Sequence, residues 1–197
     1  MPVVYSGTFA QDNYVLQISL ISDGVSTAVI DSYGYAGGSV NGNTYSPGGF
    51  APEITLYDST GMQVLDSNSG YTGNCAMVGK DAVSGNCDDP YISTVLSAGT
   101  YTLALTVYDN VSFDGNLADG FKQDQNPGFT CTETGTTGQF CDVTDALGSS
   151  RTGAYAFSIA GIQTATPEPS ALALTLCSIL LGGLGCMRRS VQKHKSN

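Results

Sequence analysis

Three aspartates in one polar loop have the side chains of a metal site. Asp88 and Asp89 stand side by side before Pro90, and Asp81 lies a short way upstream. Calcium takes several oxygens from carboxylates and loop carbonyls, so these residues predict a calcium site. The alternative is that they are solvated turn residues that cap their own backbone. No other cofactor is expected.

Catalytic constellations are scarce in this sequence. The only histidine is His194, near the C-terminus, so a Ser-His-Asp triad is not expected. No Gly-Lys-Ser/Thr phosphate loop and no His-Glu-x-x-His motif occurs. A glycosidase needs only two carboxylates, but acidic residues are too common here to mark a site, and a sugar site without tryptophan is unusual. Tyr33, Tyr35 and Tyr45 either stack on a sugar or line a sandwich edge.

Four cysteines lie in loops rich in Gly, Asn and Thr. They allow three pairings, of which local pairing, Cys75–Cys87 and Cys131–Cys141, closes two short loops and is the one we expect. A zinc site is the rival, but no Cys-x-x-Cys is present. Disulfides are typical of exported proteins. Cys177 and Cys186, in an apolar C-terminal run, are expected to be small apolar residues or lipidation sites.

The elements that must position these side chains are strands. Alternating apolar residues mark segments 14–20, 24–33, 52–67, 91–110 and 153–162. Leu16, Ile18 and Leu20 are in phase, and an Asp58–Gly61 turn divides the third segment into a hairpin. About seven to nine short strands predict an all-β, jelly-roll-like β-sandwich. The alternation predicts that each sheet keeps one solvated face.

Charge and loop length set limits on the partners. Before Thr166 there are 16 acidic and three basic residues, so this part carries 3 − 16 = −13. Such a body repels nucleic acid and anionic lipid, so a nucleic-acid partner is not expected. Three long loops, residues 37–51, 67–90 and 109–151, hold most of the Gly, Asn and Asp. Loops of this length are usually functional or cross-linked.

The chain ends differently from its body. Pro167, Glu168 and Pro169 precede an uncharged run, residues 171–186, and Arg188 and Arg189 follow it. As a helix this run is about 24 Å long, short for a bilayer, and the basic end predicts a cytoplasmic tail. A buried core helix is the alternative, but the leucines cover every side. We expect a body over 1–162, a linker over 163–169, and a membrane helix with basic tail over 170–197.

The order Pro-Glu-Pro, apolar helix, arginines resembles the PEP-CTERM sorting signal of Gram-negative, exopolysaccharide-making bacteria. The resemblance covers about the last thirty residues. It implies that an exosortase, an integral-membrane cysteine protease, recognises the segment and cleaves near Pro167, Glu168 and Pro169, with Arg188 and Arg189 as the stop. The same C-terminal region is attached to many unrelated bodies, some described as ice-binding, so it implies an address and not an activity.

The body carries a second resemblance. "EITLYDSTGMQVLDSNSG" followed by "ISTVLSAGTYTLALTVYDN" is similar to the bacterial pre-peptidase C-terminal (PPC-like) domain. "GTFAQDNYVLQISL" resembles related PEP-CTERM exoproteins that use the same sandwich. These resemblances imply a mostly non-catalytic accessory module, sometimes calcium-stabilised or carbohydrate-associated.

Together these patterns predict an exported, non-catalytic surface or extracellular-matrix protein, held at the inner membrane during sorting with its body outside the cytoplasm. An exosortase-type protease and exopolysaccharide are the expected partners. The alternatives are a carbohydrate- or ice-binding lectin-like module and a glycoside-active enzyme. No basic residue precedes Lys80 and no secretory signal opens the chain. We therefore expect the true start upstream, with a non-exported fragment as the alternative.

Overall fold

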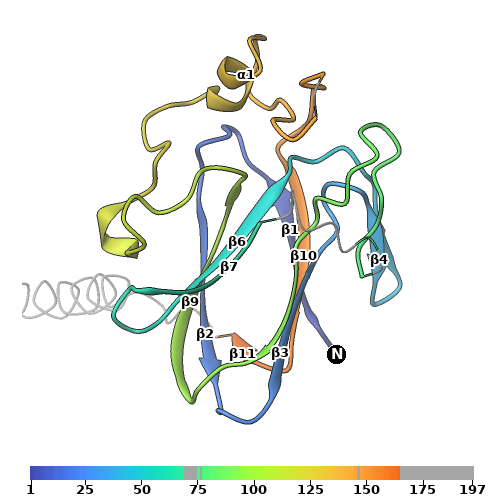
Figure 1. The fold of residues 1–197 in the computed structure, drawn as a ribbon. Coiled ribbons are helices and arrows are strands. Elements are labelled where there is room, and N and C mark those ends of the chain that lie inside the picture. Colours follow the sequence, from blue (N-terminus) through green and yellow to red (C-terminus); the bar gives the residue numbers. More distant parts are fainter. Residues whose placement is uncertain (69–74, 76, 146, 165–197) are drawn as a thin grey trace, which may run out of the picture. The chain divides into compact units, whose positions relative to one another are not determined.

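The body of the chain is a β-sandwich. The computed structural model describes residues 1–68, 75, 77–145 and 147–164. Two antiparallel sheets face each other (Figure 1). One contains, in spatial order, β1 (Val3–Thr8), β10 (Ala154–Ala160), β3 (Thr27–Ser32) and β8 (Tyr91–Val95). The other contains β11 (Gln163–Thr164), β2 (Leu16–Ser22), β9 (Gly99–Val107), β6 (Pro52–Tyr57) and β7 (Gln63–Asn68).

The strand order is that of a jelly roll. Without β11 and without the β4–β5 hairpin described below, eight strands remain, and we number them one to eight along the chain. The sheets then read 1-8-3-6 and 2-7-4-5, the interleaved order of that double Greek key. Each strand therefore crosses to the opposite sheet, except in the β6–β7 hairpin. The predicted all-β, jelly-roll-like sandwich is confirmed.

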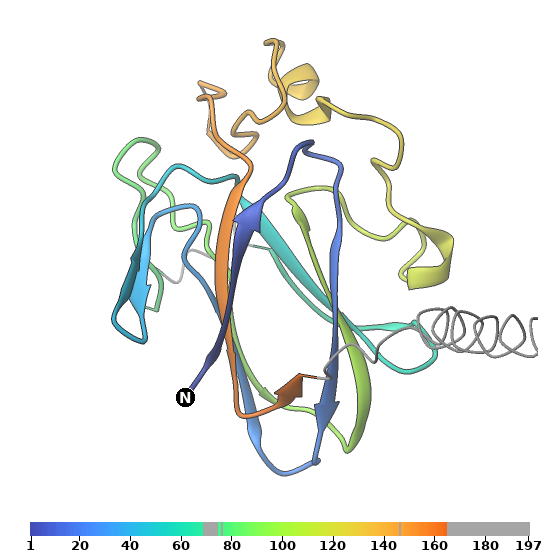
Figure 2. The same ribbon diagram turned by 180° about the vertical axis from the view of Figure 1, so that it is seen from behind.

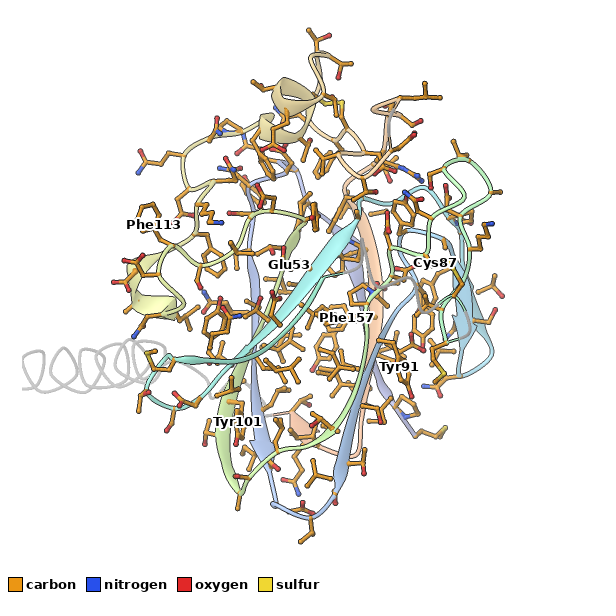
Figure 3. The ribbon with its side chains drawn as sticks, viewed as in Figure 1. Glu53, Cys87, Tyr91, Tyr101, Phe113 and Phe157 are labelled. Atoms are coloured by element: carbon orange, nitrogen blue, oxygen red, sulfur yellow. A yellow bond between two sulfur atoms is a disulfide. The ribbon has the colours of Figure 1, made fainter. Side chains whose placement is uncertain are left out.

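The core lies between the sheets and follows the predicted alternation. Ile18 and Leu20 of β2 and Leu103 and Leu105 of β9 are all buried, together with Ile30 of β3. On the inner face of the first sheet, Tyr5 of β1 stacks on its cross-strand partner Phe157 of β10 with ring centroids 5.3 Å apart; Figure 3 shows Phe157 between the two layers. Burial of apolar side chains of this size contributes about 1.5–3 kcal/mol each, so this interior is the main source of stability.

The prediction of one solvated face per sheet is wrong over β6 and β9. All six residues of β6 are buried, and so are Ala104 and Thr106 on the outward side of β9. The reason is residues 109–124, here called the cover loop, which run across this face and contain the short 3-10 helix η1 (Leu117–Asp119). Phe121 and Leu117 pack with Tyr57 and Ala104 outside the sheet.

Four strands fall outside the predicted segments. β1 and β11 add to the sheets, and β4 (Gly38–Val40) and β5 (Asn43–Tyr45) form a small hairpin in what was predicted to be loop. β11 pairs with β2, so the expected linker begins with two residues of the body. The turn inside the hairpin uses Asn41 and Gly42 with positive φ, which favours these residue types.

The α-helix of the described residues and its neighbouring loops lie at one end of the sandwich. The helix α1 (Phe129–Glu133) and the loops around it lie beyond the same end as the β1–β2 connection (Figure 2). The expected C-terminal helix and its sorting residues lie outside the described part of the chain. Among the residues that are described, no helix is long and apolar enough to cross a membrane.

Candidate functional site

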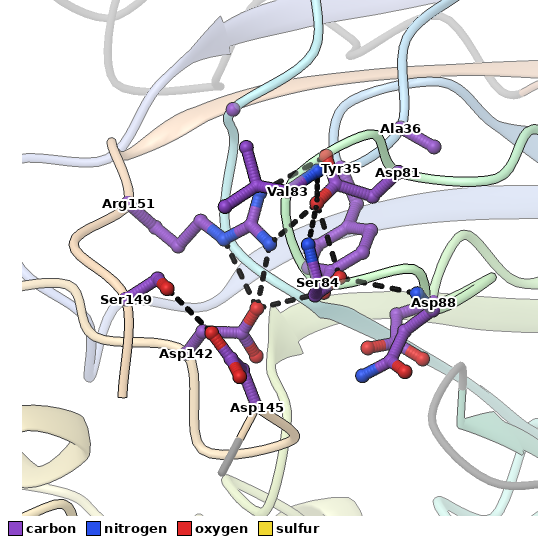
Figure 4. Close-up of polar contacts among 12 residues, drawn as sticks. Tyr35, Ala36, Asp81, Val83, Ser84, Asp88, Asp142, Asp145, Ser149 and Arg151 are labelled. Atoms are coloured by element: carbon purple, nitrogen blue, oxygen red, sulfur yellow. Dashed lines mark hydrogen bonds and ion pairs between the residues drawn. The ribbon is translucent and has the colours of Figure 1, made fainter. Parts of the chain in front are cut away.

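A buried arginine joins two of the long loops. Arg151 Nη2 lies 2.9 Å from Asp81 Oδ2 and 2.7 Å from Asp142 Oδ2, and Nε adds a 3.0 Å bond to the same Asp142 oxygen. All three side chains are at most 2% exposed. Figure 4 shows the guanidinium between the two carboxylates. Two anions therefore share one cation in an interior where each needs a partner.

An aromatic ring completes this cluster. The Arg151 guanidinium carbon lies 4.1 Å from the ring centroid of Tyr35, close enough for a cation–π contact. The Tyr35 hydroxyl donates to Asp142 over 2.7 Å and lies 2.6 Å from the Ser84 hydroxyl. Burial alone would raise the pKa of Asp81, but Arg151 and Ser84 bond its carboxylate and bring that pKa down to about 2. Asp81 is therefore held ionised.

The three aspartates predicted to bind calcium have separate protein partners. Asp81 bonds Arg151. Asp88 accepts from the Thr144 hydroxyl, whereas Asp89 accepts from Ser32 Oγ at 2.7 Å and from the Ala36 amide at 2.8 Å. Burial raises the pKa of both Asp88 and Asp89.

These partners leave little for a calcium ion at the predicted residues. Within the described ranges, no group of three acidic, cysteine or histidine side chains is arranged to hold a metal ion. The cation between Asp81 and Asp142 is the guanidinium of Arg151. The three aspartates do not fit calcium as a set, and their roles in this geometry are to fasten loops to the sandwich.

Both expected disulfides are present. Cys75 pairs with Cys87 and Cys131 with Cys141, so the structure contains the local pairing. Cys87 directly precedes Asp88, and Cys141 directly precedes Asp142, the partner of Arg151. The covalent bridges and the buried ion pairs therefore restrain the same two loops, and this end of the sandwich is built as a cross-linked unit.

A shallow groove on the outer face of the first sheet is the best candidate for binding a ligand. Its volume is about 320 Å³, at the small end of the range for ligand pockets. The floor is made of small residues of β1, β10 and the segment after β3, and Tyr45 of the hairpin stands at its side. The lining residues are Ser6, Gly7, Thr8, Gly34, Tyr45, Ser46, Ala154, Tyr155 and Ala156.

Tyr45, the aromatic residue at the side of this groove, packs against a second tyrosine. Tyr45 stacks on Tyr33 with ring centroids 6.3 Å apart and an interplanar angle of 18°. The Tyr33 hydroxyl in turn lies 3.0 Å from the Ser158 hydroxyl. A side chain at Gly38 would come within 2.7 Å of the Tyr33 ring, so glycine is needed for the hairpin to lie against it. Tyr45 is therefore presented on a braced platform.

The three tyrosines that were expected either to stack on a sugar or to line a sandwich edge have different positions. Tyr45 lines the groove and Tyr33 supports it. Tyr35 is fully buried beneath Arg151, so its proposed role in sugar stacking is wrong. The physical reason is that its hydroxyl bonds Asp142 and its ring packs against the Arg151 guanidinium.

A second recess lies on the outer face of the other sheet. It has a volume of about 510 Å³ and lies between the β6–β7 turn, β9 and η1. Thr60, Thr100 and Thr102 contribute hydroxyls to it. A hollowed threonine surface differs from the flat one that would favour ice binding, so that alternative gains no support here.

No known protein-family model matches the chain, and no curated protein matches its sequence. The PEP-CTERM and PPC-like resemblances therefore remain predictions that rest on the motifs themselves. The sorting residues Pro167, Glu168, Pro169, Arg188 and Arg189 lie outside the described residues.

Sequence reasoning missed the residues that organise the loops. Arg151 and Asp142 were not singled out, although Arg151 is one of only three basic residues before Thr166. A lone arginine in a strongly acidic body is itself a signal, because its charge is rarely left unpaired in a polar loop of this composition. Asp142 is only nine residues away in the sequence, whereas Asp81 is 70 residues away and no local pattern connects it with Arg151.

Proposed function

We propose that this protein is a non-catalytic, exported surface or extracellular-matrix protein, addressed by a C-terminal sorting signal. The observation that carries the proposal is the pair of disulfides, Cys75–Cys87 and Cys131–Cys141, which brace the long loops of the sandwich. Such bridges persist in oxidising compartments outside the cytoplasm. The Pro-Glu-Pro, apolar and arginine order of residues 167–189 supports the same destination.

In this proposal the apolar run holds the protein at the inner membrane until an exosortase-type protease acts. A run of 16 uncharged residues is a marginal anchor, which suits a temporary attachment. The body is then released to the cell surface or matrix, where exopolysaccharide is the expected partner.

The test is fractionation of the producing bacterium followed by intact mass of the protein found. A mature form outside the cell that ends close to Thr166 supports sorting and also fixes the true N-terminus. A full-length form in the inner membrane would mean a permanent anchor. Recovery from the cytoplasm with reduced cysteines would contradict the proposal as a whole.

A second candidate function, binding of a neutral saccharide, is favoured by the Tyr45 groove. Sugars bind with their apolar face on an aromatic ring and their hydroxyls bonded to polar groups, and this groove offers a braced tyrosine beside Ser6, Thr8 and Ser46. Its lining contains no carboxylate pair, which a glycosidase needs, so the geometry suits binding without hydrolysis. The acidic body disfavours anionic polysaccharides.

A further inference from the structure

Glu53 is a buried carboxyl group on the outer side of β6. Its side chain points away from the core, between the sheet and the cover loop (Figure 3), and only 1% of the residue is exposed. Its Oε2 accepts a 3.1 Å hydrogen bond from the backbone amide of Asp109, the first residue of the cover loop. Its Oε1 accepts no hydrogen bond from any donor group. A buried ionised oxygen without a partner is costly.

A second carboxyl group lies beside it on the same face. In the β6–β7 ladder Thr55 is opposite Asp66 and Glu53 is opposite Asn68, so Glu53 and Asp66 are diagonal neighbours. Asp66 is exposed, and Thr55 Oγ1 lies 3.3 Å from its Oδ1. The ion pairs found among the described residues both belong to Arg151, so neither of them compensates Glu53.

More unpartnered polar atoms accompany Glu53 under the cover loop. Tyr57 Oη on β6 and Ser112 Oγ on the loop are both buried without a hydrogen-bond partner. The loop is also closed on itself near its two ends, where the Gln123 amide bonds Asn110 Oδ1 at 3.0 Å. Ionisation of Glu53 would therefore add a buried charge beneath a segment that already covers several unsatisfied groups.

We propose that Glu53 and Asp66 form a proton-binding site that fastens the cover loop to the sheet. Glu53 carries the proton and donates it through Oε1 to the ionised Asp66 carboxylate, while Oε2 keeps the amide of Asp109. Loss of this proton at mildly alkaline pH leaves two adjacent negative charges, one of them buried, and loosens residues 109–124 from the sheet.

Most of the surroundings of Glu53 oppose its ionisation. The groups that face it are the carboxylates of Asp66 on β7 and Asp109 after β9, and the phenols of Tyr57 and Tyr108. Burial, and then the charge of Asp66, raises the pKa of Glu53 to about 8, and the Asp109 amide lowers it only in part. The folded state thus keeps a proton that the unfolded state releases above its ordinary pKa, so stability falls as the pH rises from about 4.5 to about 8.

The test compares the full-length wild type with two variants in a neutral detergent between pH 5 and 9. Glu53→Gln is a neutral amide that can donate to Asp66 without a titrating proton. Asp114→Asn is the matched control, because it removes one charge from an exposed position of the same loop. The readouts are the melting temperature and the exchange protection of the Gln123 amide, corrected for the intrinsic effect of pH on exchange.

In wild type and Asp114→Asn we expect the exchange protection of the Gln123 amide to fall by up to about tenfold for each unit by which the pH rises toward 8. In Glu53→Gln the protection should not change with pH. An unchanged pH dependence in Glu53→Gln would overturn the proposal. So would a calcium-induced rise of the wild-type melting temperature at pH 8 that Glu53→Gln lacks, because a cation would then occupy the pair.

If Glu53→Gln does not fold, a direct titration of the wild-type protein tests the proposal instead. In wild-type protein labelled with carbon-13 at the glutamate carboxyls, the buried Glu53 signal should titrate above the signals of the two other glutamates, Glu133 and Glu168. Titration of every glutamate signal near its ordinary value would refute the shared proton.

Discussion

Arg151 and Asp81 are 70 positions apart in the sequence, yet Nη2 of one lies 2.9 Å from Oδ2 of the other. The pair connects the loop after β7 with the loop that precedes β10. Asp142 and the ring of Tyr35 close the cluster around the same guanidinium. Two long polar loops are in this way fixed to the sandwich.

Replacing Arg151 should therefore destabilise the body strongly. Arg151→Met leaves Asp81 and Asp142 buried without a cation, and loss of one partner of a buried pair costs about 3–5 kcal/mol. Arg151→Lys should recover only part of this, because lysine cannot bond both carboxylates through a planar fork. Denaturant unfolding measures the free energy.

The control for this prediction is Lys122→Gln, an exposed basic residue of the cover loop, which should change stability by no more than about 0.5 kcal/mol. If Arg151→Met proved as stable as Lys122→Gln, the cluster would have no structural role.

The same cluster predicts a loss of stability in acid. The pKa of Asp81 is about 2 in the folded protein against an ordinary value of 3.8. Because the folded pKa is the lower one, its contribution is complete above the ordinary value and disappears as the pH falls toward 2. Melting curves of wild type should shift steeply across this window, and those of Asp81→Asn less so. Equal shifts would argue against this assignment.

Removal of either disulfide should lower the free energy of unfolding. The bridges close loops with sequence separations of 12 and 10, and bridges of this span contribute about 2–3 kcal/mol. Cys75→Ser/Cys87→Ser and Cys131→Ser/Cys141→Ser should each lose an amount of this order in denaturant unfolding. Peptide mapping without reductant checks the pairing itself, and a Cys75–Cys131 peptide would contradict it.

Asp12 should stabilise the start of α1 in the way a helix-capping residue does, although it belongs to the β1–β2 connection. Its carboxylate accepts from the Gly128 amide at 2.6 Å, the Thr130 amide at 2.9 Å and the Thr130 hydroxyl at 2.8 Å, at the start of α1. Asp12→Ala leaves buried donors unsatisfied and should cost about 2–4 kcal/mol. Thermal unfolding measures this, with exposed Asp119→Ala as the control; a similar loss in both variants would contradict the capping role.

Tyr45 should control any saccharide binding by the groove. Tyr45→Ala removes the ring from the wall and should weaken binding of a neutral polysaccharide by up to about tenfold, since an aromatic stacking contact contributes about 0.5–1.5 kcal/mol. Phe113→Ala, an exposed aromatic residue on the cover loop, should bind like wild type. Affinity electrophoresis with neutral and anionic polysaccharides measures both, and equal losses would locate binding elsewhere.

Much of the fold was predictable because it depends on local patterns. Alternation along residues 14–20 and 91–110 identified β2, β8 and β9, and the Asp58–Gly61 turn identified the β6–β7 hairpin. The pairing of cysteines close in sequence was also predictable, since short loops close at a small entropic cost. These features need only neighbours along the chain.

The site depended on contacts that no local pattern contains. The sequence by itself determined which residues face the core, the excess of acidic charge and the short-range disulfides. Only the tertiary structure decided that Arg151 takes the place between Asp81 and Asp142, that Tyr35 is buried while Tyr45 lines a groove, and that Glu53 lies beneath the cover loop. The physical reason is that burial and charge pairing arise when distant segments pack together. The alternation of apolar and polar residues shows only which side of a strand a side chain is on.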